Sequence, residues 1–145
     1  TITGTPAQDP PVIGAPTHTL VLLNGQPQRD RVGQQDERYY VFYVPAGVTG
    51  AITISVDPIQ GDSDLYVNPS ARGIFHHEGN DPFPVWTSMR SNGMDSVTIQ
   101  SSDRNAVING GAYYITVFGY DAAEFMVRVT VENTATALVE GYTIQ

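Results

Sequence analysis

Two segments of this chain, Gly61-Asp-Ser-Asp-Leu-Tyr-Val67 and Gly111-Ala-Tyr-Tyr-Ile-Thr-Val-Phe-Gly-Tyr120, carry β-strand patterns bounded by glycine and turn-forming polar residues. The second runs on into residues 124–132, where four apolar residues at alternate positions, from Phe125 to Val131, share one side. Such alternation is typical of a strand with one face in a core and the other in water. The two segments therefore indicate a β-domain.

Five further strand patterns lie outward from these segments, at residues 19–23, 38–44, 51–56, 85–89 and 96–100. Glycine, proline, asparagine and aspartate separate them. Asp57-Pro58 predicts the end of the 51–56 strand, and Asn92-Gly93 predicts a hairpin turn between the last two. No stretch shows sustained helical periodicity. We therefore predict an all-β fold, an antiparallel, jelly-roll-like β-sandwich of about eight strands.

The ends of the chain differ from this pattern. Residues 1–16 contain four prolines, which exclude a helix or a central strand and predict an extended arm. Residues 17–133 form the predicted sandwich domain, and residues 134–145 form a tail that is partly strand-like.

Composition narrows the possible functions. The 145 residues suffice for one domain with a sizeable core. Cysteine and lysine are both absent, which excludes disulfides, thiolate zinc sites and Schiff-base chemistry. A net charge of −8 repels nucleic acid, and no apolar run is long enough to span a membrane. Low charge content with abundant Thr, Ser, Gly, Pro and Tyr leads us to expect an extracellular or cell-surface protein.

The order of the motifs adds a family resemblance. A tyrosine-rich strand ends in Val-Pro-Ala-Gly (residues 44–47), and a β-branched strand (52–56), the Gly61–Val67 motif, Trp86-Thr-Ser88 and the Gly111–Tyr120 motif follow. This order resembles the bacterial pre-peptidase C-terminal domain, over roughly residues 17–133. The resemblance implies a secreted β-sandwich without catalytic activity, usually attached to a hydrolase, that binds a substrate polymer or acts in secretion and adhesion. Related collagen-binding modules of clostridial collagenases also bind calcium.

The residues themselves do not suggest an enzyme. Ser63 lacks the closing glycine of a nucleophile elbow, and His77-Glu78 is not followed by a second histidine at zinc-site spacing. Asp62 and Asp64 are two apart, so their carboxylates point to the same side of an extended chain. Calcium accepts such ligands, whereas the alternative is that both aspartates bond local backbone amides as turn formers. Calcium at Asp62 and Asp64 is therefore one possible cofactor.

Several strands have two apolar faces, although a sandwich sheet needs only one. Either tyrosine and valine simply suit exposed strands, or a terminal arm, a neighbouring subunit or a ligand covers the second face. The candidate interface or ligand residues on this face are Val21, Leu23, Tyr39, Val41, Tyr43, Tyr114 and Phe118.

Apolar residues in the arm and tail indicate that the chain ends pack against something, because unanchored ends are normally disordered. These residues are Ile2, Val12, Ile13, Leu138, Val139, Tyr142 and Ile144. The surface that holds the chain ends is either their own domain or another copy of the chain. Packing on another copy, by strand addition or groove filling, would build a head-to-tail filament or surface layer, which is the leading hypothesis. The alternative is an accessory module of a secreted hydrolase that binds a polysaccharide or a fibrous protein, and mutation of Tyr39, Tyr43 and Tyr114 would test it.

Overall fold

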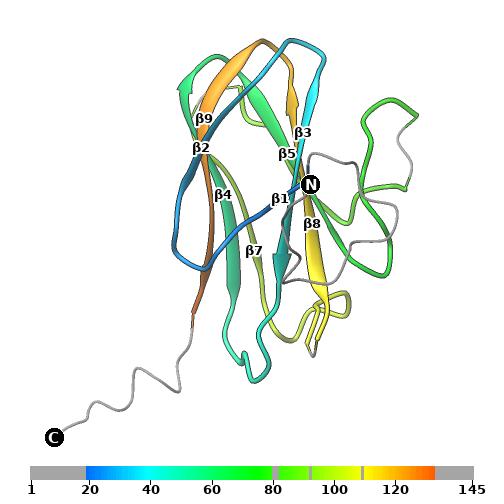
Figure 1. The fold of residues 1–145 in the computed structure, drawn as a ribbon. Coiled ribbons are helices and arrows are strands. Elements are labelled where there is room, and N and C mark those ends of the chain that lie inside the picture. The colour runs from blue at the N-terminus through cyan, green and yellow to red at the C-terminus, as the bar shows by residue number, and fades with distance from the viewer. Residues whose placement is uncertain (1–18, 80–81, 92, 109, 133–145) are drawn as a thin grey trace, which may run out of the picture.

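A computed structural model describes residues 19–79, 82–91, 93–108 and 110–132, which form two packed β-sheets (Figure 1). The five-stranded sheet has the order β1-β3-β8-β5-β6, and the four-stranded sheet has the order β2-β9-β4-β7. The strands are β1 Leu20–Val21, β2 Gln28–Val32, β3 Glu37–Tyr43, β4 Ile52–Gln60, β5 Ser63–Pro69, β6 Trp86–Ser88, β7 Asp95–Ile99, β8 Ala112–Gly119 and β9 Ala123–Val131. The β-sandwich expected from the sequence is therefore confirmed.

Nearly all strand pairs are antiparallel. In the five-stranded sheet β8 lies between β3 and β5, and in the four-stranded sheet β9 lies between β2 and β4. The two-residue β1 is an exception, because it pairs with β3 in parallel.

The core lies between the sheets and contains the inward-facing residues of both. In β9 the residues from Phe125 to Val129 alternate between buried and less buried, as the sequence pattern predicts. The largest fully buried side chains of this core include Tyr40, Ile54, Leu65, Ile99, Tyr113, Ile115 and Phe125. Each such side chain stabilises the fold by about 1.5–3 kcal/mol through burial.

The structure differs from the predicted strands and turns at three places. The strand predicted to end at Asp57-Pro58 continues to Gln60, and the pairing of β4 with β9 shifts register between Pro58 and Gln60. A bulge of this kind is one of the places where a sheet tolerates proline. The predicted hairpin at residues 92–93 is wrong because β6 and β7 belong to different sheets. The sequence pattern also missed β2, in which only Val32 is buried.

The outer face of the five-stranded sheet is covered by the chain itself. The connection between β5 and β6 turns back over this face, and we call its residues 70–79 the covering segment (green in Figure 1). Ile74 packs against Val41 and Tyr114, while Phe75 packs against Tyr66 and Phe118. The second apolar face noted in the sequence is therefore largely a second, smaller core.

Buried hydrogen bonds hold the covering segment in place. The Thr116 hydroxyl donates to the Phe75 carbonyl at 2.8 Å. The fully buried Asn68 side chain donates to the Gly73 carbonyl at 3.1 Å and accepts from the Val85 amide at 2.7 Å. Because buried polar groups that lose a partner are costly, these bonds fix where the segment lies on the sheet.

Candidate ligand-binding pocket

A pocket of about 560 Å³ opens where the covering segment meets the end of the five-stranded sheet. We call it the Asp64 pocket. Its lining comes from β5 and β8, from the covering segment and from the turns at this end of the sandwich. The lining residues are Gln35, Asp62, Asp64, Tyr66, His77, Met89, Ser91, Phe118 and Tyr120.

Aromatic rings form much of the pocket wall. The imidazole of His77 stacks on the ring of Phe118, with centroids 3.7 Å apart and planes 7° apart. Tyr66 packs against Phe75 with ring centroids 4.3 Å apart, and its hydroxyl donates to the Met89 sulfur at 3.4 Å. The rings thus position one another without any ligand.

Glu37 anchors the covering segment beside the pocket. Its carboxylate accepts hydrogen bonds from the His77 backbone amide and from the Tyr39 hydroxyl. The Nδ1 atom of His76 lies 3.7 Å from the same carboxylate and 3.1 Å from the Tyr39 hydroxyl. Glu37 therefore holds the backbone that carries the His77 ring.

Two turns close together form the rim of the pocket. The Asp121 amide donates to the Asp62 carbonyl at 3.0 Å, which joins the β8–β9 turn to the β4–β5 turn. Gly61 makes this approach possible: it has a φ of +85°, and a Cβ atom there would lie 2.0 Å from the Ala122 carbonyl oxygen. On the opposite rim, Gln35 adopts a φ of 62°, and its amide donates to the Gly119 carbonyl at 2.6 Å.

Asp64 supplies a buried carboxyl group to this pocket. The residue is 8% exposed and lies directly across from Phe118 in the β5–β8 pairing. No hydrogen bond or ion pair joins its side chain to any other part of the described chain. Burial, and then the charges of Asp62 and Asp95, raise the pKa of Asp64 to about 6. Burial and the nearby Asp64 charge likewise raise the pKa of Tyr66 to about 12.

Asp95, by contrast, is a buried carboxylate whose partners are in place. It accepts from the Ser88 hydroxyl at 2.8 Å and from the Arg90 amide at 2.7 Å. Burial raises the pKa of Asp95, and these two hydrogen bonds oppose the rise. Its role is to join β6 of one sheet to β7 of the other.

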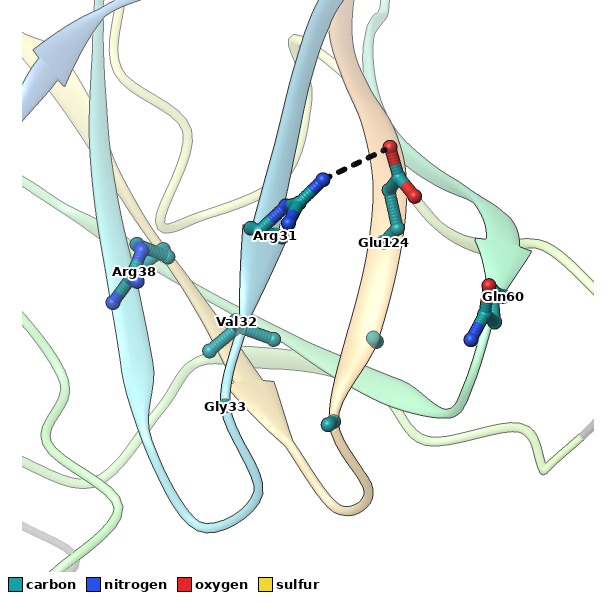
Figure 2. Close-up of a pocket in the computed structure, with 8 residues that line it drawn as sticks. Arg31, Val32, Gly33, Arg38, Gln60 and Glu124 are labelled. Carbon is teal, nitrogen blue, oxygen red and sulfur yellow. Dashed lines mark ion pairs between the residues drawn. The ribbon is translucent and has the colours of Figure 1, made fainter.

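A second pocket, of about 500 Å³, is lined by residues of β2, β3, β4 and β9 and of the β2–β3 and β8–β9 turns (Figure 2). Figure 2 shows Arg31 of β2 reaching toward Glu124 of β9, and the two side chains are 3.8 Å apart. Glu124 also pairs with Arg29 at 2.6 Å, and Arg38 pairs with Asp36 at 3.3 Å. Because these charges already have partners at the surface, this pocket offers a weaker case for a ligand.

The predicted calcium ligands, Asp62 and Asp64, do come together in the Asp64 pocket. No group of three His, Asp or Glu side chains within the described ranges is arranged to hold a metal ion. Calcium normally takes six to eight oxygen ligands, so two carboxylates make an incomplete site. Calcium binding stays a prediction.

The structure divides the predicted interface residues into three groups. Val41, Tyr114 and Phe118 are buried beneath the covering segment, and Phe118 also lines the Asp64 pocket. Their assignment to an interface or ligand face stays a prediction. Tyr39 and Tyr43 are half-buried beside the covering segment, whereas Val21 and Leu23 are exposed at and after β1. The residues assigned to assembly, in the arm 1–16 and the tail 134–145, lie outside the described residues, so head-to-tail assembly also stays a prediction.

Sequence reasoning missed His77, Tyr66 and Tyr120 as pocket residues. A signal for Tyr66 was present, since Asp62, Asp64 and Tyr66 alternate and therefore share a face of the strand. His77 had no such signal, because it reaches the pocket only through the fold of the covering segment. His76 contacts Tyr39 and Glu37, and His77 stacks on Phe118. No hydrogen bond joins either histidine to a serine within the described residues, although Ser91 lines the same pocket as His77. The described part of the chain also contains no helix of the length and apolar character that a membrane span requires.

Comparisons with known proteins give similarity in structure alone. No family model matches the chain, and no curated protein matches it in sequence. Among solved structures, the pre-peptidase C-terminal domain of collagenase from Bacillus anthracis is similar, with a TM-score of 0.55 and 16% identity, over 81% of this chain and 99% of that one. PliG from Aeromonas hydrophila, a periplasmic inhibitor of g-type lysozyme, has a TM-score of 0.49 and 12% identity, over 79% of this chain and 96% of that one. The first similarity shows that this chain shares the fold of a pre-peptidase C-terminal domain, as the order of its motifs suggested.

Proposed function

We propose that this chain is a non-catalytic extracellular binding module that takes up a projecting group of a protein partner in the Asp64 pocket. The observation that carries the proposal is the pocket itself, a concavity of about 560 Å³ built from aromatic rings and a buried carboxyl. Largely apolar pockets with a few converging polar groups are the usual form of a ligand site.

The pocket is formed before a ligand arrives. Glu37 holds the His77 backbone, His77 stacks on Phe118, and the Tyr66 hydroxyl is bonded to Met89. Binding therefore need not order these side chains, and the conformational cost that weakens many interfaces is reduced.

The shape favours a protein partner over a polysaccharide. Phe118 and Asp64 line the pocket and are both buried, so a ligand reaches them only by inserting a group. A side chain projects from its backbone in this way, whereas sugar rings stack on broad, exposed aromatic faces. The similarity in fold to a collagenase domain supports the choice of a fibrous protein as one probe.

Retention on insoluble polymers tests this function. The full chain is incubated with collagen fibrils, cellulose, chitin and peptidoglycan, alongside Tyr120→Ala at the pocket rim and Phe83→Ala as the control. Tyr120 is 59% exposed and Phe83 is 64% exposed, so neither change should disturb the core.

The proposal expects retention on the protein polymer, reduced by Tyr120→Ala and unchanged by Phe83→Ala. Retention on a polysaccharide instead, or retention that Tyr120→Ala leaves intact, would contradict it.

A further inference from the structure

We propose that the group received by the Asp64 pocket is a cationic side chain of the partner, in the first place the guanidinium of an arginine, with Asp64 as its counter-ion. The inference rests on the proposed function and names the chemical class of the ligand.

The Asp64 carboxyl has no partner among the residues that the structure describes. It is buried, it lies beside Phe118 across the strand pair, and it has no hydrogen bond or ion pair with other described residues. A buried charge without a partner is costly, and Asp62 and Asp95 add like-charge repulsion. A cation entering the pocket would remove both penalties at once.

Within the described residues, no lysine or arginine side chain lines the pocket. The chain contains no lysine. Its seven arginines, at positions 29, 31, 38, 72, 90, 104 and 128, are all outside the lining of the pocket. With the net charge at −8, the field around the pocket attracts a cation from outside.

The rest of the lining suits a long cationic side chain. Tyr120 and His77 are exposed residues of the pocket lining, and Tyr120 offers a ring face for a cation–π contact. Met89 is 61% exposed and can cover the aliphatic part of the side chain. Arginine should bind more tightly than lysine, because a guanidinium both stacks on rings and donates two parallel hydrogen bonds to a carboxylate.

A titration of the full chain followed by amide chemical shifts tests this inference. The probes are N-acetyl-arginine amide and N-acetyl-citrulline amide, which have nearly the same shape but differ in charge. The lysine and norleucine amides form a second such pair. We expect saturable shifts at Asp64, Tyr66, His77, Phe118 and Tyr120 with arginine, and binding at least roughly tenfold weaker with citrulline.

Two variants test whether Asp64 causes the preference for arginine over citrulline. Asp64→Asn keeps the shape of the side chain and should abolish the preference for arginine over citrulline. Glu132→Gln removes the same charge at the exposed C-terminal end of β9 and should leave the preference unchanged. The amide spectrum of each variant shows directly whether it is folded.

Three results would overturn the inference. Equal binding of the arginine and citrulline amides in the pocket would show that the charge of the ligand is not recognised, while leaving the proposed binding function intact. The absence of saturable shifts with the arginine amide would show that the pocket does not bind a guanidinium, and it too would leave the proposed binding function intact. Calcium that shifts the same amides of EDTA-treated protein and excludes arginine would assign the carboxylates to a metal. A lack of retention on every polymer, with arginine still bound, would instead contradict the proposed function and leave the cation site standing.

Discussion

His77 stacks on Phe118 with the two rings nearly parallel and their centroids 3.7 Å apart. His77 belongs to the covering segment and Phe118 to β8, so this contact joins a loop to a buried strand of the five-stranded sheet. The same contact forms one wall of the Asp64 pocket. The pocket is therefore complete only when the covering segment lies on the sheet.

Replacing Thr116 with valine should destabilise the covering segment without leaving a cavity. The change removes the hydrogen bond from the Thr116 hydroxyl to the Phe75 carbonyl and leaves that carbonyl buried without its donor. We expect the free energy of unfolding to fall by about 1–2 kcal/mol in urea denaturation. Thr98→Val, at an exposed position of β7, should change it by less than about 0.5 kcal/mol. Equal effects of the two changes would show that the covering segment contributes little.

Replacing Gly61 with alanine should separate the two turns at the pocket rim. The new Cβ atom would lie 2.0 Å from the Ala122 carbonyl oxygen, so the β8–β9 turn must move. We expect a loss of more than about 3 kcal/mol, since strain from positive φ and a backbone clash add together.

Gly47→Ala provides the matched control for this change. Gly47 has nearly the same φ, +82°, but a Cβ atom there would have no neighbour within 4 Å. Thermal unfolding should show a loss of only about 1–2 kcal/mol. If Gly61→Ala is no more destabilising than Gly47→Ala, the close approach of the two turns is wrong.

Asp64→Asn should stabilise the protein without ligand at neutral pH. The pKa of Asp64 is raised to about 6 in the fold, above the value of about 3.9 of an unfolded aspartate. The native state then binds the proton more tightly than the unfolded state, so the penalty from Asp64 appears as pH rises from about 4 to about 6 and stays constant above. Because solvent reaches the group through the pocket, we expect a gain of about 1–2 kcal/mol at pH 7 and none at pH 4. Melting temperatures of both proteins across this range provide the check, and a variant that is less stable at pH 7 would reveal an overlooked partner of Asp64.

Binding of N-acetyl-arginine amide should weaken on acidification. Arginine pairs with ionised Asp64, so its affinity should fall by up to tenfold per pH unit below about pH 6. The charges of Asp62 and Asp95 also act on this carboxyl, and Tyr66 and the His77 imidazole line the same pocket. The measurement is therefore repeated in His77→Gln, which should keep the pH dependence. An affinity that is constant between about pH 5 and about pH 7.5 would show that arginine binding does not depend on the ionisation of Asp64.

The sequence predicts the sandwich well because alternation reports directly on burial. From Phe125 to Val129 every second residue contacts the core, and the motif from Gly111 to Tyr120 lies on the central strand β8. Edge strands carry a weaker signal. Only Val32 of β2 is buried, so Gln28–Val32 has no alternating pattern to find.

The sequence pattern predicted only some of the residues that line the pocket. Alternation brings Asp62 and Asp64 to one side of a strand, and they do share the pocket. The covering segment could not be foreseen, because residues 70–79 have no periodic pattern and are held by particular contacts at Asn68, Thr116 and Glu37. The two apolar faces of β3 and β8 left open whether a further layer covers the sheet, and the fold shows that the covering segment forms this layer.

Magnetisation transfer between a bound arginine and the pocket rings tests the central claim most directly. Intermolecular nuclear Overhauser effects would be recorded from the side-chain methylenes of N-acetyl-arginine amide to the assigned aromatic protons of the full chain. We predict contacts to Tyr120, His77 and Phe118, all of which line the Asp64 pocket. Contacts confined to other aromatic residues, such as Phe83 or Trp86, would contradict the account.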